Sequence, residues 1–500
     1  MTKKLLLSIT LASFLASNSL LAEENLDADL GGFDIEEVAS DESSDLEGFG
    51  DEGETSDLDG FGDDTITPTQ KSVPEAEVKQ QMFSLSGDLA FKTSYGYRDH
   101  EVKAYKADTQ GVDYSGFNQA QTALYLQLDG KLSDNWKMRV GLDTFYDVIY
   151  DLHSNNDYND ETLESYQTQL MLTDAYIQGR LTNDIDLKVG RQIVVWGKSD
   201  SIRITDVINP LDNRLPGMTD IEDLRLSVGI AKLDYYLGQW NFSAMAIAEN
   251  RIMLEAAPRS EFFPVDAVFP NGAPDPFIPL EEPSSSWDNM QYAFAANGIF
   301  SGWDLSFYGA NVLDQKWHIE GSTPQTLTRK VSKVKMLGSA INIATGSWLL
   351  KSEVAYLNGV RYNSTSDEKN RLDALVGFDY MGIRDTVLSL EIADRHIFDH
   401  EAQMADLNTL RPDYVDEDEI QTAIRATRSF ENDSINATAL LSMFGSSWEY
   451  GGFARLWVEY DVIDAVVANF GVVDYLDGDK PFTKAISDND RIFADITYSF

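Results

Sequence analysis

Few side chains in this 500-residue chain offer acid–base or nucleophilic chemistry. It has five histidines and no cysteine, which excludes a thiol nucleophile, a disulfide framework and a zinc finger. Asp99-His100 and Asp399-His400 are adjacent pairs of the kind that activates water in a hydrolase. With 83 acidic residues, however, a histidine often adjoins an acid by chance. Neither a Gly-x-Ser-x-Gly nor a His-Glu-x-x-His motif occurs, so we expect no catalytic residues and no enzyme activity.

The same residues offer little to a metal ion. His396 and His400 are four positions apart, and in a strand that spacing separates them by about 13 Å, too far to share an ion. The acidic residues near the N-terminus do not follow the spacing of an EF-hand loop. We expect no metal site and no cofactor.

One polar motif stands out from the rest of the chain. Gly190-Arg191-Gln192 leads through three apolar residues to Trp196-Gly197, and Asn209-Pro210-Leu211-Asp212 follows. Arg191 is suited to pair with an acidic residue and Trp196 to lie at the rim of a barrel. The alternative is that Gly, Trp and Asn-Pro only turn a strand that runs from 185 to 196 into a packed internal loop, and we favour this alternative.

The net charge of −44 is distributed unevenly. Residues 23–64 contain 18 acidic residues and no Lys or Arg, which is typical of a disordered tail. Such an excess of negative charge excludes nucleic acid as a partner. Before the tail, Lys3 and Lys4 precede an apolar run, and residues 1–22 are predicted to be a secretory signal peptide.

Within the acidic tail, residues 23–80, the pattern Asp-Leu-x-Gly-Phe occurs three times. An apolar pair, a glycine and flanking acids are typical of short linear motifs that bind a pocket with a basic rim. The alternative is drift in a low-complexity tether. The predicted partner-binding residues are Leu30, Phe33, Leu46, Phe49, Leu58 and Phe61.

From Phe83 onward the apolar residues alternate with polar ones, which indicates half-buried strands. Polar turns of two to four residues separate pairs of strands, and longer segments separate the pairs. Short turns alternating with long loops are typical of a transmembrane β-barrel, with the short turns in the periplasm. We therefore predict that residues 81–500 form an all-β, antiparallel outer-membrane barrel of about 18 strands (16–18), with both termini in the periplasm.

The last strand carries a further signal. Residues 492–500 alternate and end on Tyr498-Ser499-Phe500. This pattern resembles the closing-strand signature that the barrel-assembly machinery of Gram-negative bacteria reads. We expect Tyr498 and Phe500 to serve as that signal, with this machinery and outer-membrane lipid as partners.

Residues 258–283 hold seven of the 14 prolines. Proline keeps this segment out of a central strand. It is predicted either to fold into the barrel mouth as a constriction or to stand outside as a rigid loop, and the sequence does not decide between the two.

Over residues 80–500 the chain resembles the proteobacterial outer-membrane family labelled domain of unknown function 1302. The sharpest part of the resemblance is the motif of Gly190, Arg191, Gln192, Trp196 and Gly197 with Asn209, Pro210 and Asp212. Genes of that family tend to neighbour inner-membrane exporters of the resistance-nodulation-division type. The resemblance therefore implies an outer-membrane component of an envelope transport pathway for hydrophobic or lipid-like cargo.

Three functions follow from these features. The leading hypothesis is a channel or conduit that the acidic tail couples to a periplasmic or inner-membrane partner, an exporter of that type. The second is a stand-alone, porin-like diffusion channel, and the third is an outer-membrane hydrolase. The sequence favours the first.

Overall fold

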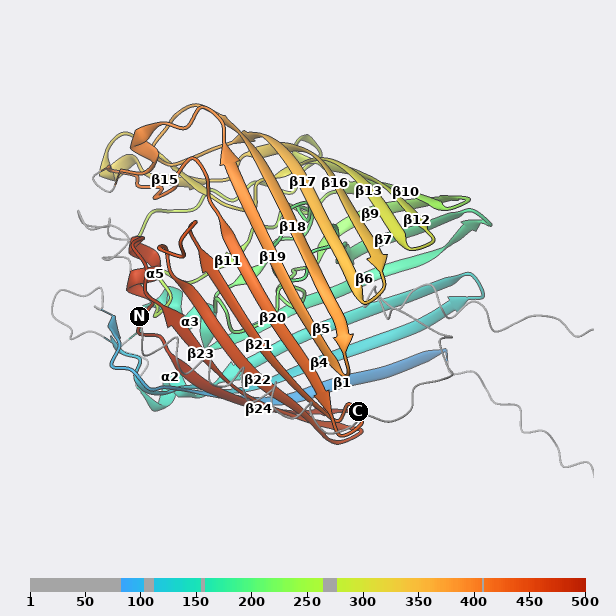
Figure 1. Cartoon of the computed structure of the whole chain (residues 1–500), viewed down its shortest axis with the longest axis horizontal. Coiled ribbons are helices and arrows are strands. Elements are labelled where there is room, and N and C mark those ends of the chain that lie inside the picture. Colours follow the sequence, from blue (N-terminus) through green and yellow to red (C-terminus); the bar gives the residue numbers. More distant parts are fainter. Residues whose placement is uncertain (1–81, 103–111, 154–157, 264–276, 407–408) are drawn as a thin grey trace, which may run out of the picture. The chain divides into compact units, whose positions relative to one another are not determined.

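The structure is a computed structural model that describes residues 82–102, 112–153, 158–263, 277–406 and 409–500 (Figure 1). Eighteen antiparallel strands form one closed sheet in these residues. Each strand pairs with its neighbour along the chain, and the last pairs with the first. The predicted all-β barrel of 18 strands is confirmed.

The barrel strands have the following bounds: β1 Phe83–Gly96, β4 Gly116–Ser133, β5 Trp136–Asp147, β6 Thr168–Thr182, β7 Ile185–Gln192, β9 Val228–Leu237, β10 Trp240–Ile247, β12 Gln291–Phe300, β13 Trp303–Leu313, β16 Lys333–Thr345, β17 Trp348–Val360, β18 Lys369–Ile383, β19 Thr386–Ile397, β20 Gln421–Phe430, β21 Ile435–Phe444, β22 Gly452–Ile463, β23 Val466–Leu476 and β24 Arg491–Ser499.

Short elements lie in the connections between these strands. The paired two- or three-residue strands are β2 Glu101–Val102 with β3 Val112–Asp113, β8 Asp212–Asn213 with β11 Leu254–Glu255, and β14 His318–Glu320 with β15 Thr328–Lys330. The helices and 3-10 turns are α2 Ile149–Leu152, α3 Asp160–Tyr166, α5 Pro481–Ala485, η2 Trp287–Asn289, η3 Pro324–Thr326 and η4 Ala402–Met404. No helix in the described part of the chain is long and apolar enough to cross a membrane.

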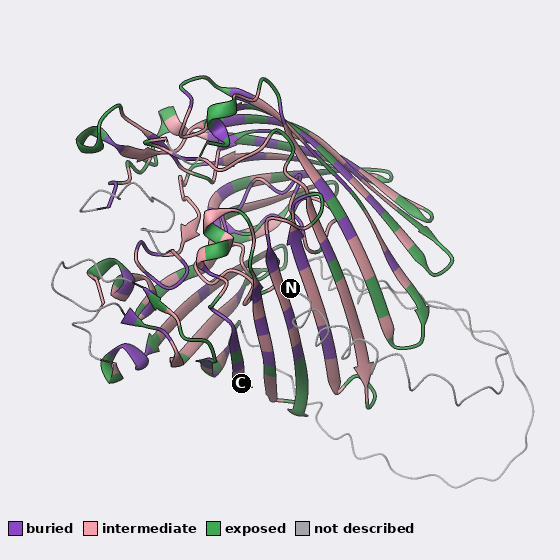
Figure 2. Ribbon diagram, turned by 60° about the vertical axis from the view of Figure 1, so that its left-hand side comes forward, coloured by how far each residue is buried: buried purple, intermediate pink, exposed green. Residues whose placement is uncertain are grey.

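Along many strands, buried or half-buried residues alternate with exposed ones, as the bands of colour in Figure 2 show. In β13, Phe307 is 49% exposed on the outside, whereas the next residue, Tyr308, is 6% exposed inside. Leu85 and Phe91 on β1 are exposed outside, and Ala90 between them is buried. An outer face rich in exposed apolar side chains suits lipid and not water.

The barrel closes at a seam between β24 and β1. Ser499 lies opposite Asp88, and the last residue, Phe500, exchanges two backbone hydrogen bonds with Gly87, at 3.0 and 2.9 Å. A Cβ atom on Gly87 would lie 2.9 Å from the Phe500 ring. The seam therefore needs both the terminal aromatic ring and the glycine beneath it.

Short turns join the strands in pairs, as the alternation predicted, for example β4 to β5 after Ser133 and β16 to β17 at Gly346. The predicted long segments are also present at the opposite ends of the strands, and two further connections, 445–451 and 477–490, belong with them. The described chain begins and ends at the rim that carries the short turns, as the bonds between Gly87 and Phe500 and from Lys131 to Met82 show.

One strand boundary was wrong. The sequence predicts a strand from 185 to 196, but β7 ends at Gln192. Beyond it, Val194 and Trp196 are buried within the barrel, because the chain leaves the wall here and packs inside. Tertiary packing overrides the strand propensity of the Ile-Val-Val run.

The seam generates a first prediction. Phe500→Ala removes the ring over Gly87 and should reduce the fraction of assembled barrel several-fold, as read by heat-modifiable migration of outer-membrane fractions on gels. Phe470→Ala is the matched control, because Phe470 on the neighbouring β23 is a similarly exposed outer aromatic residue. Equal loss in both variants would show that the position of Phe500 has no special role.

Candidate functional site in the barrel lumen

Residues 193–227 leave β7 and run through the barrel interior before joining β9. We call them the lumen segment. Its apolar side chains pack on the inner face of strands β9 to β20, which we call the apolar wall. The buried members on the lumen segment are Val194, Trp196, Ile202, Ile204 and Ile208. On this side, therefore, the lumen is filled by a packed apolar core and not by water.

Small residues on the apolar wall let the lumen segment approach closely. Alanines occupy the wall at positions where a larger side chain would displace the lumen segment. They are Ala293, Ala295, Ala310, Ala340, Ala355, Ala393 and Ala423. Trp196 stacks on Tyr308 with ring centroids 4.7 Å apart. Trp196 thus lies against the middle of β13, not at the rim.

Glu353 on β17 binds the lumen segment from the wall. One carboxylate oxygen accepts the backbone N–H groups of Lys198, at 2.5 Å, and Ser199, at 2.7 Å. The other oxygen accepts the backbone N–H and the hydroxyl of Thr205, at 3.2 and 2.8 Å. A Cβ atom on Gly197 would lie 2.9 Å from both carboxylate oxygens. The glycine of the sequence motif is therefore what lets the carboxylate reach this turn.

Glu391 on β19 continues the same arrangement. Its carboxylate accepts the backbone N–H groups of Asp200, Ser201 and Ile202 at 2.7, 3.0 and 3.1 Å. Five successive amides, 198 to 202, thus point at two carboxylates, which is the geometry of a backbone nest around an anion. Glu353 and Glu391 are 2% and 1% exposed, and hydrogen bonds to a buried charged group are the stronger kind.

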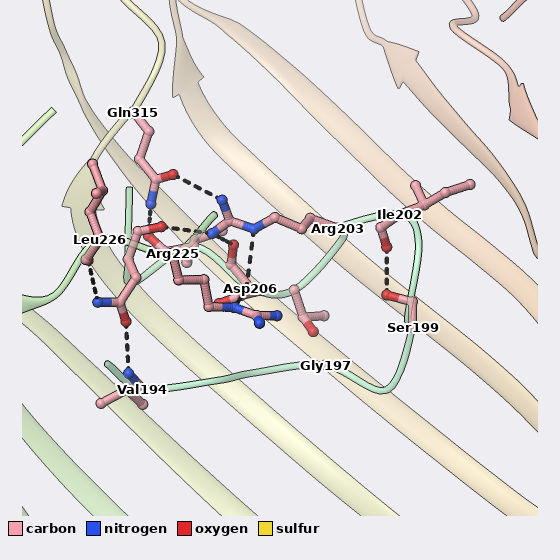
Figure 3. Close-up of polar contacts among 12 residues, drawn as sticks. Val194, Gly197, Ser199, Ile202, Arg203, Asp206, Arg225, Leu226 and Gln315 are labelled. Carbon is pink, nitrogen blue, oxygen red and sulfur yellow. Dashed lines mark hydrogen bonds and ion pairs between the residues drawn. The ribbon is translucent and has the colours of Figure 1, made fainter. Parts of the chain in front are cut away.

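The second half of the motif connects different parts of the lumen segment to one another. The Asn209 side chain accepts the N–H of Val194 at 2.8 Å and donates to the carbonyl of Leu226 at 2.8 Å. Arg203 and Arg225 converge on Asp206, at 3.2 and 2.8 Å (Figure 3). The motif from Gly190 to Asp212 therefore builds a folded internal loop.

The lumen segment also reaches the inner face of strands β20 to β24. Asp220 forms ion pairs with Arg425 on β20, at 2.8 Å, and Arg455 on β22, at 2.9 Å. The Tyr475 hydroxyl on β23 donates to the carbonyl of Pro216 at 2.6 Å. The polypeptide thus crosses the lumen from one wall to the other.

Residues 258–263 of the proline-rich segment lie inside the barrel, whereas residues 277–283 pack against the connection that carries β14 and β15. Phe262 is fully buried among Trp457, Tyr475 and Phe493, which come from β22, β23 and β24. Glu261 forms an ion pair with Arg491 at 2.9 Å. Of the two alternatives for 258–283, an internal constriction holds for residues 258–263, whereas 264–276 lie outside the described part of the chain.

Arg191 is held by neighbouring parts of the barrel wall. Its guanidinium pairs with Glu249, which follows β10, and donates to the carbonyl of Leu172 at 2.8 Å. Gln192 is fully buried and donates to the carbonyl of Ile230 at 3.1 Å. Asp212 pairs with Arg214. These family-motif residues therefore support the start of the lumen segment and are not gathered at one reactive point.

The inner face of β4 to β7 has a different character, and we call it the polar wall. Tyr125 donates to Gln127 at 2.9 Å, Gln127 donates to Asp129 at 2.6 Å, and Arg139 pairs with Asp129 at 2.8 Å. Lys188 lies 3.8 Å from the centroid of the Tyr176 ring. These side chains are half-buried, which suits a water-filled passage along this side.

Between the lumen segment and strands β18 to β23 lies a cavity of about 750 Å³. Apolar side chains from both sides line it, among them Ile204, Leu357, Leu440 and Phe453. Six cationic side chains, including Arg371, Arg395 and Arg425, and six acidic side chains also line it. A volume in this range suits a small ligand.

In the described part of the chain, the aspartate and the histidine of the two adjacent Asp-His pairs are not hydrogen-bonded to each other. This holds for Asp99 with His100 and for Asp399 with His400. The His400 ring instead contacts the carbonyl of Val415 at 3.0 Å, and His396 pairs with Asp418 at 2.6 Å. Within the described ranges no group of three or more His, Asp or Glu side chains could hold a metal ion.

The six predicted partner-binding residues of the acidic repeats, from Leu30 to Phe61, lie outside the described residues. Tyr498 and Phe500 lie on the outer face of the seam, with ring centroids 6.0 Å apart. Sequence reasoning missed the two anchoring glutamates. Their only signal is an acidic residue at an inward position of a strand, and a water-filled lumen produces the same pattern.

A closed barrel of 18 antiparallel strands with an apolar exterior is the fold of an outer-membrane β-barrel, whose place is the outer membrane of a Gram-negative bacterium. Residues 69–500 match the model of the family described as "Protein of unknown function (DUF1302)". The chain belongs to this family, as the motif at 190–212 led us to expect. A search of curated proteins finds no match.

Solved outer-membrane barrels are similar in fold at low identity. OccAB1 of Acinetobacter baumannii is 10% identical, with a TM-score of 0.47, and the match covers 83% of this chain and 96% of that one. OccD3 (OpdP) of Pseudomonas aeruginosa is 12% identical, with a TM-score of 0.45 and coverage of 84% and 91%. The outer membrane channel DcaP of Acinetobacter baumannii is 12% identical, with a TM-score of 0.40 and coverage of 84% and 97%.

The anchors generate a second prediction. Glu353→Gln replaces one acceptor oxygen by an NH₂ group that faces backbone donors, which should cost about 2–4 kcal/mol of lumen-segment stability. Hydrogen–deuterium exchange of residues 197–205 should then accelerate at least tenfold while the barrel strands keep their protection.

Glu459→Gln is the matched control, because Glu459 lies on the inner face of β22 and is exposed to the lumen. It should leave the exchange of residues 197–205 unchanged. Unchanged exchange in the Glu353 variant would contradict the anchoring role.

Proposed function

We propose that the protein is an outer-membrane channel whose lumen segment is a plug, and that passage requires the plug to move. The observation that carries this proposal is the crossing of the lumen by residues 193–227, which leave the wall at β7, rejoin it at β9, and are held by Glu353, Glu391, Arg425 and Arg455 on strands β17 to β22. An 18-stranded barrel without such a filling encloses an aqueous channel.

The acidic tail suggests what moves the plug. We propose that the Asp-Leu-x-Gly-Phe repeats bind a periplasmic or inner-membrane partner, an exporter of the resistance-nodulation-division type. We also propose that both termini of the chain lie in the periplasm. The rim with short turns is the periplasmic one in barrels of this kind. The apolar lining of the cavity supports a hydrophobic or lipid-like cargo.

The second candidate is a stand-alone diffusion channel. The polar wall favours it, because Gln127, Asp129 and Arg139 would line a passage for water and small polar solutes. In this case the lumen segment is a fixed constriction and conductance needs neither its movement nor the tail.

The chain's lack of cysteine permits a direct test of plug movement. A Cβ atom at Gly338 on β16 would lie 3.0 Å from Cγ2 of Thr205, which suits a disulfide between Thr205→Cys and Gly338→Cys. In planar bilayers, Glu353→Gln should raise the frequency of open-channel events at least tenfold over the wild type, although the closed state still predominates. Adding the oxidised cysteine pair to this variant should restore the low level, and reduction should release it.

The reduced form of the same protein is the control. A wild-type conductance that is already high, and is unaffected by the disulfide, would support the stand-alone channel and contradict the plug.

The tail generates a separate prediction. Replacing Phe33, Phe49 and Phe61 by Ala should remove at least nine-tenths of a co-purifying envelope protein, because each repeat loses its larger apolar contact. The measurement is affinity purification from envelopes with mass spectrometry. The matched control replaces Ile35, Val38 and Ile66, which are apolar tail residues outside the repeats. An identical set of captured proteins in both variants would refute the motif.

A further inference from the structure

The cavity beside the lumen segment contains one cation that stands apart from the others. Three of its charged neighbours are engaged: Arg371 pairs with Asp373 at 2.7 Å, Arg425 pairs with Asp220 at 2.8 Å, and Lys480 pairs with Glu419 at 2.5 Å. No described carboxylate lies within ion-pair distance of Arg395. Arg395, on β19, therefore differs from these three cations in having no direct ion pair.

The polar contacts of Arg395 are weak and uncharged. One terminal nitrogen donates to the amide oxygen of Gln421 at 3.2 Å, and the other donates to the backbone carbonyl of Arg203 at 3.4 Å. A guanidinium has five N–H donors, so most of its capacity is unused by the protein. The side chain points inward at a position that lines the cavity.

Two of the acids near Arg395, Asp373 and Glu419, are hydrogen-bonded to other cations. Asp373, which lies opposite Arg395 in the β18–β19 register, forms two hydrogen bonds to Arg371 at 2.7 and 2.8 Å. Glu419 accepts both of its hydrogen bonds from Lys480. Arg395 thus has the negative charges of Asp373, Glu419 and Asp394 nearby but no direct ion pair, and a bound anion would supply one.

The rest of the cavity is suited to the other end of such a ligand. Apolar side chains from the lumen segment, from the wall and from the α5 region enclose a space of about 750 Å³. They include Ile204, Val334, Leu357, Leu440, Phe453 and Ile486. This volume is large enough for an aliphatic chain of about ten carbons.

We propose that this cavity binds an amphipathic anion, with its carboxylate or phosphate head on Arg395 and its aliphatic body against the apolar lining. Arginine presents a planar fork that matches either head group in two hydrogen bonds. The inference deepens the proposed transport function by naming the chemical class of the cargo. It also places the cargo site beside the plug, because the Arg395 side chain donates a hydrogen bond to the carbonyl of Arg203 in the lumen segment.

The test begins on the unmodified protein in neutral maltoside micelles, with empty micelles as the blank. Isothermal titration with decanoate should show saturable binding of one molecule per chain, at least tenfold tighter than decanol, which has the same chain and no charge. Decyl phosphate distinguishes the two head groups, and binding of either anion supports the proposal. Equal binding of decanoate and decanol, or no binding of either anion, would overturn it without any variant.

Arg395→Gln should then abolish the preference for the anion and leave decanol binding within a factor of two. Arg395→Lys should retain part of the preference. The matched control is Arg384→Gln, at the opposite end of the same β18–β19 hairpin, where the side chain is 93% exposed. It should bind as the wild type does. An unchanged preference in heat-modifiable, folded Arg395→Gln would refute the role of this residue.

Photo-crosslinking fixes the location of the ligand. A decanoate with a diazirine at its terminal carbon should label the apolar lining, for example Leu440 or Phe453, and excess decanoate should suppress that labelling. Labelling only on the outer surface of the barrel would overturn the proposal. The outcome is independent of the plug experiment, because a fixed constriction could still bind the anion and a mobile plug need not.

Discussion

The lumen segment is constrained above all by its backbone. A chain inside a barrel has no neighbouring strand to pair with, yet each buried N–H needs an acceptor. The wall supplies acceptors as carboxylates: Glu353 and Glu391 take five successive amides of the lumen segment. The charge on each carboxylate is in turn stabilised by those amides. Neither partner is satisfied alone, so the fold of the lumen segment and the composition of the wall depend on each other.

This dependence explains the two faces of the lumen. Where the lumen segment lies, the wall is mostly alanines and aliphatic side chains, with Glu353, Glu391 and a few other buried polar side chains such as Lys351 between them. Where it does not lie, the wall carries the hydrogen-bonded series from Tyr125 to Arg139. A uniformly aqueous channel would need polar residues on both sides. The asymmetry therefore shows that the lumen segment belongs to the barrel core.

Much of the barrel could be predicted from the sequence because period-two alternation and short turns are local signals. The strands from Phe83 to Ser499 and their number follow from them. The end of β7 could not, because residues 193–195 have strand propensity and only the packing of Val194 and Trp196 against distant wall strands ends the pairing there. Glu353 could not be recognised either, since its partners lie about 150 residues away and an inward glutamate fits a wet lumen equally well. For the motif at 190–212 the family resemblance marked the right residues, and the geometry supplied their role.

The packing also sets how easily the lumen segment could move. Val194, Trp196, Ile202, Ile204 and Ile208 are all buried on the apolar wall. Exposing an apolar side chain of this size costs about 1.5–3 kcal/mol, so exposing all five costs on the order of 10 kcal/mol. Every 1.4 kcal/mol corresponds to a tenfold change in population, so spontaneous opening would be rare. A stable open state would therefore need free energy from a bound partner or from an amphipathic ligand. Such a ligand would pack on the apolar wall that the lumen segment leaves exposed. It would be most effective in the cavity, which already adjoins the lumen segment.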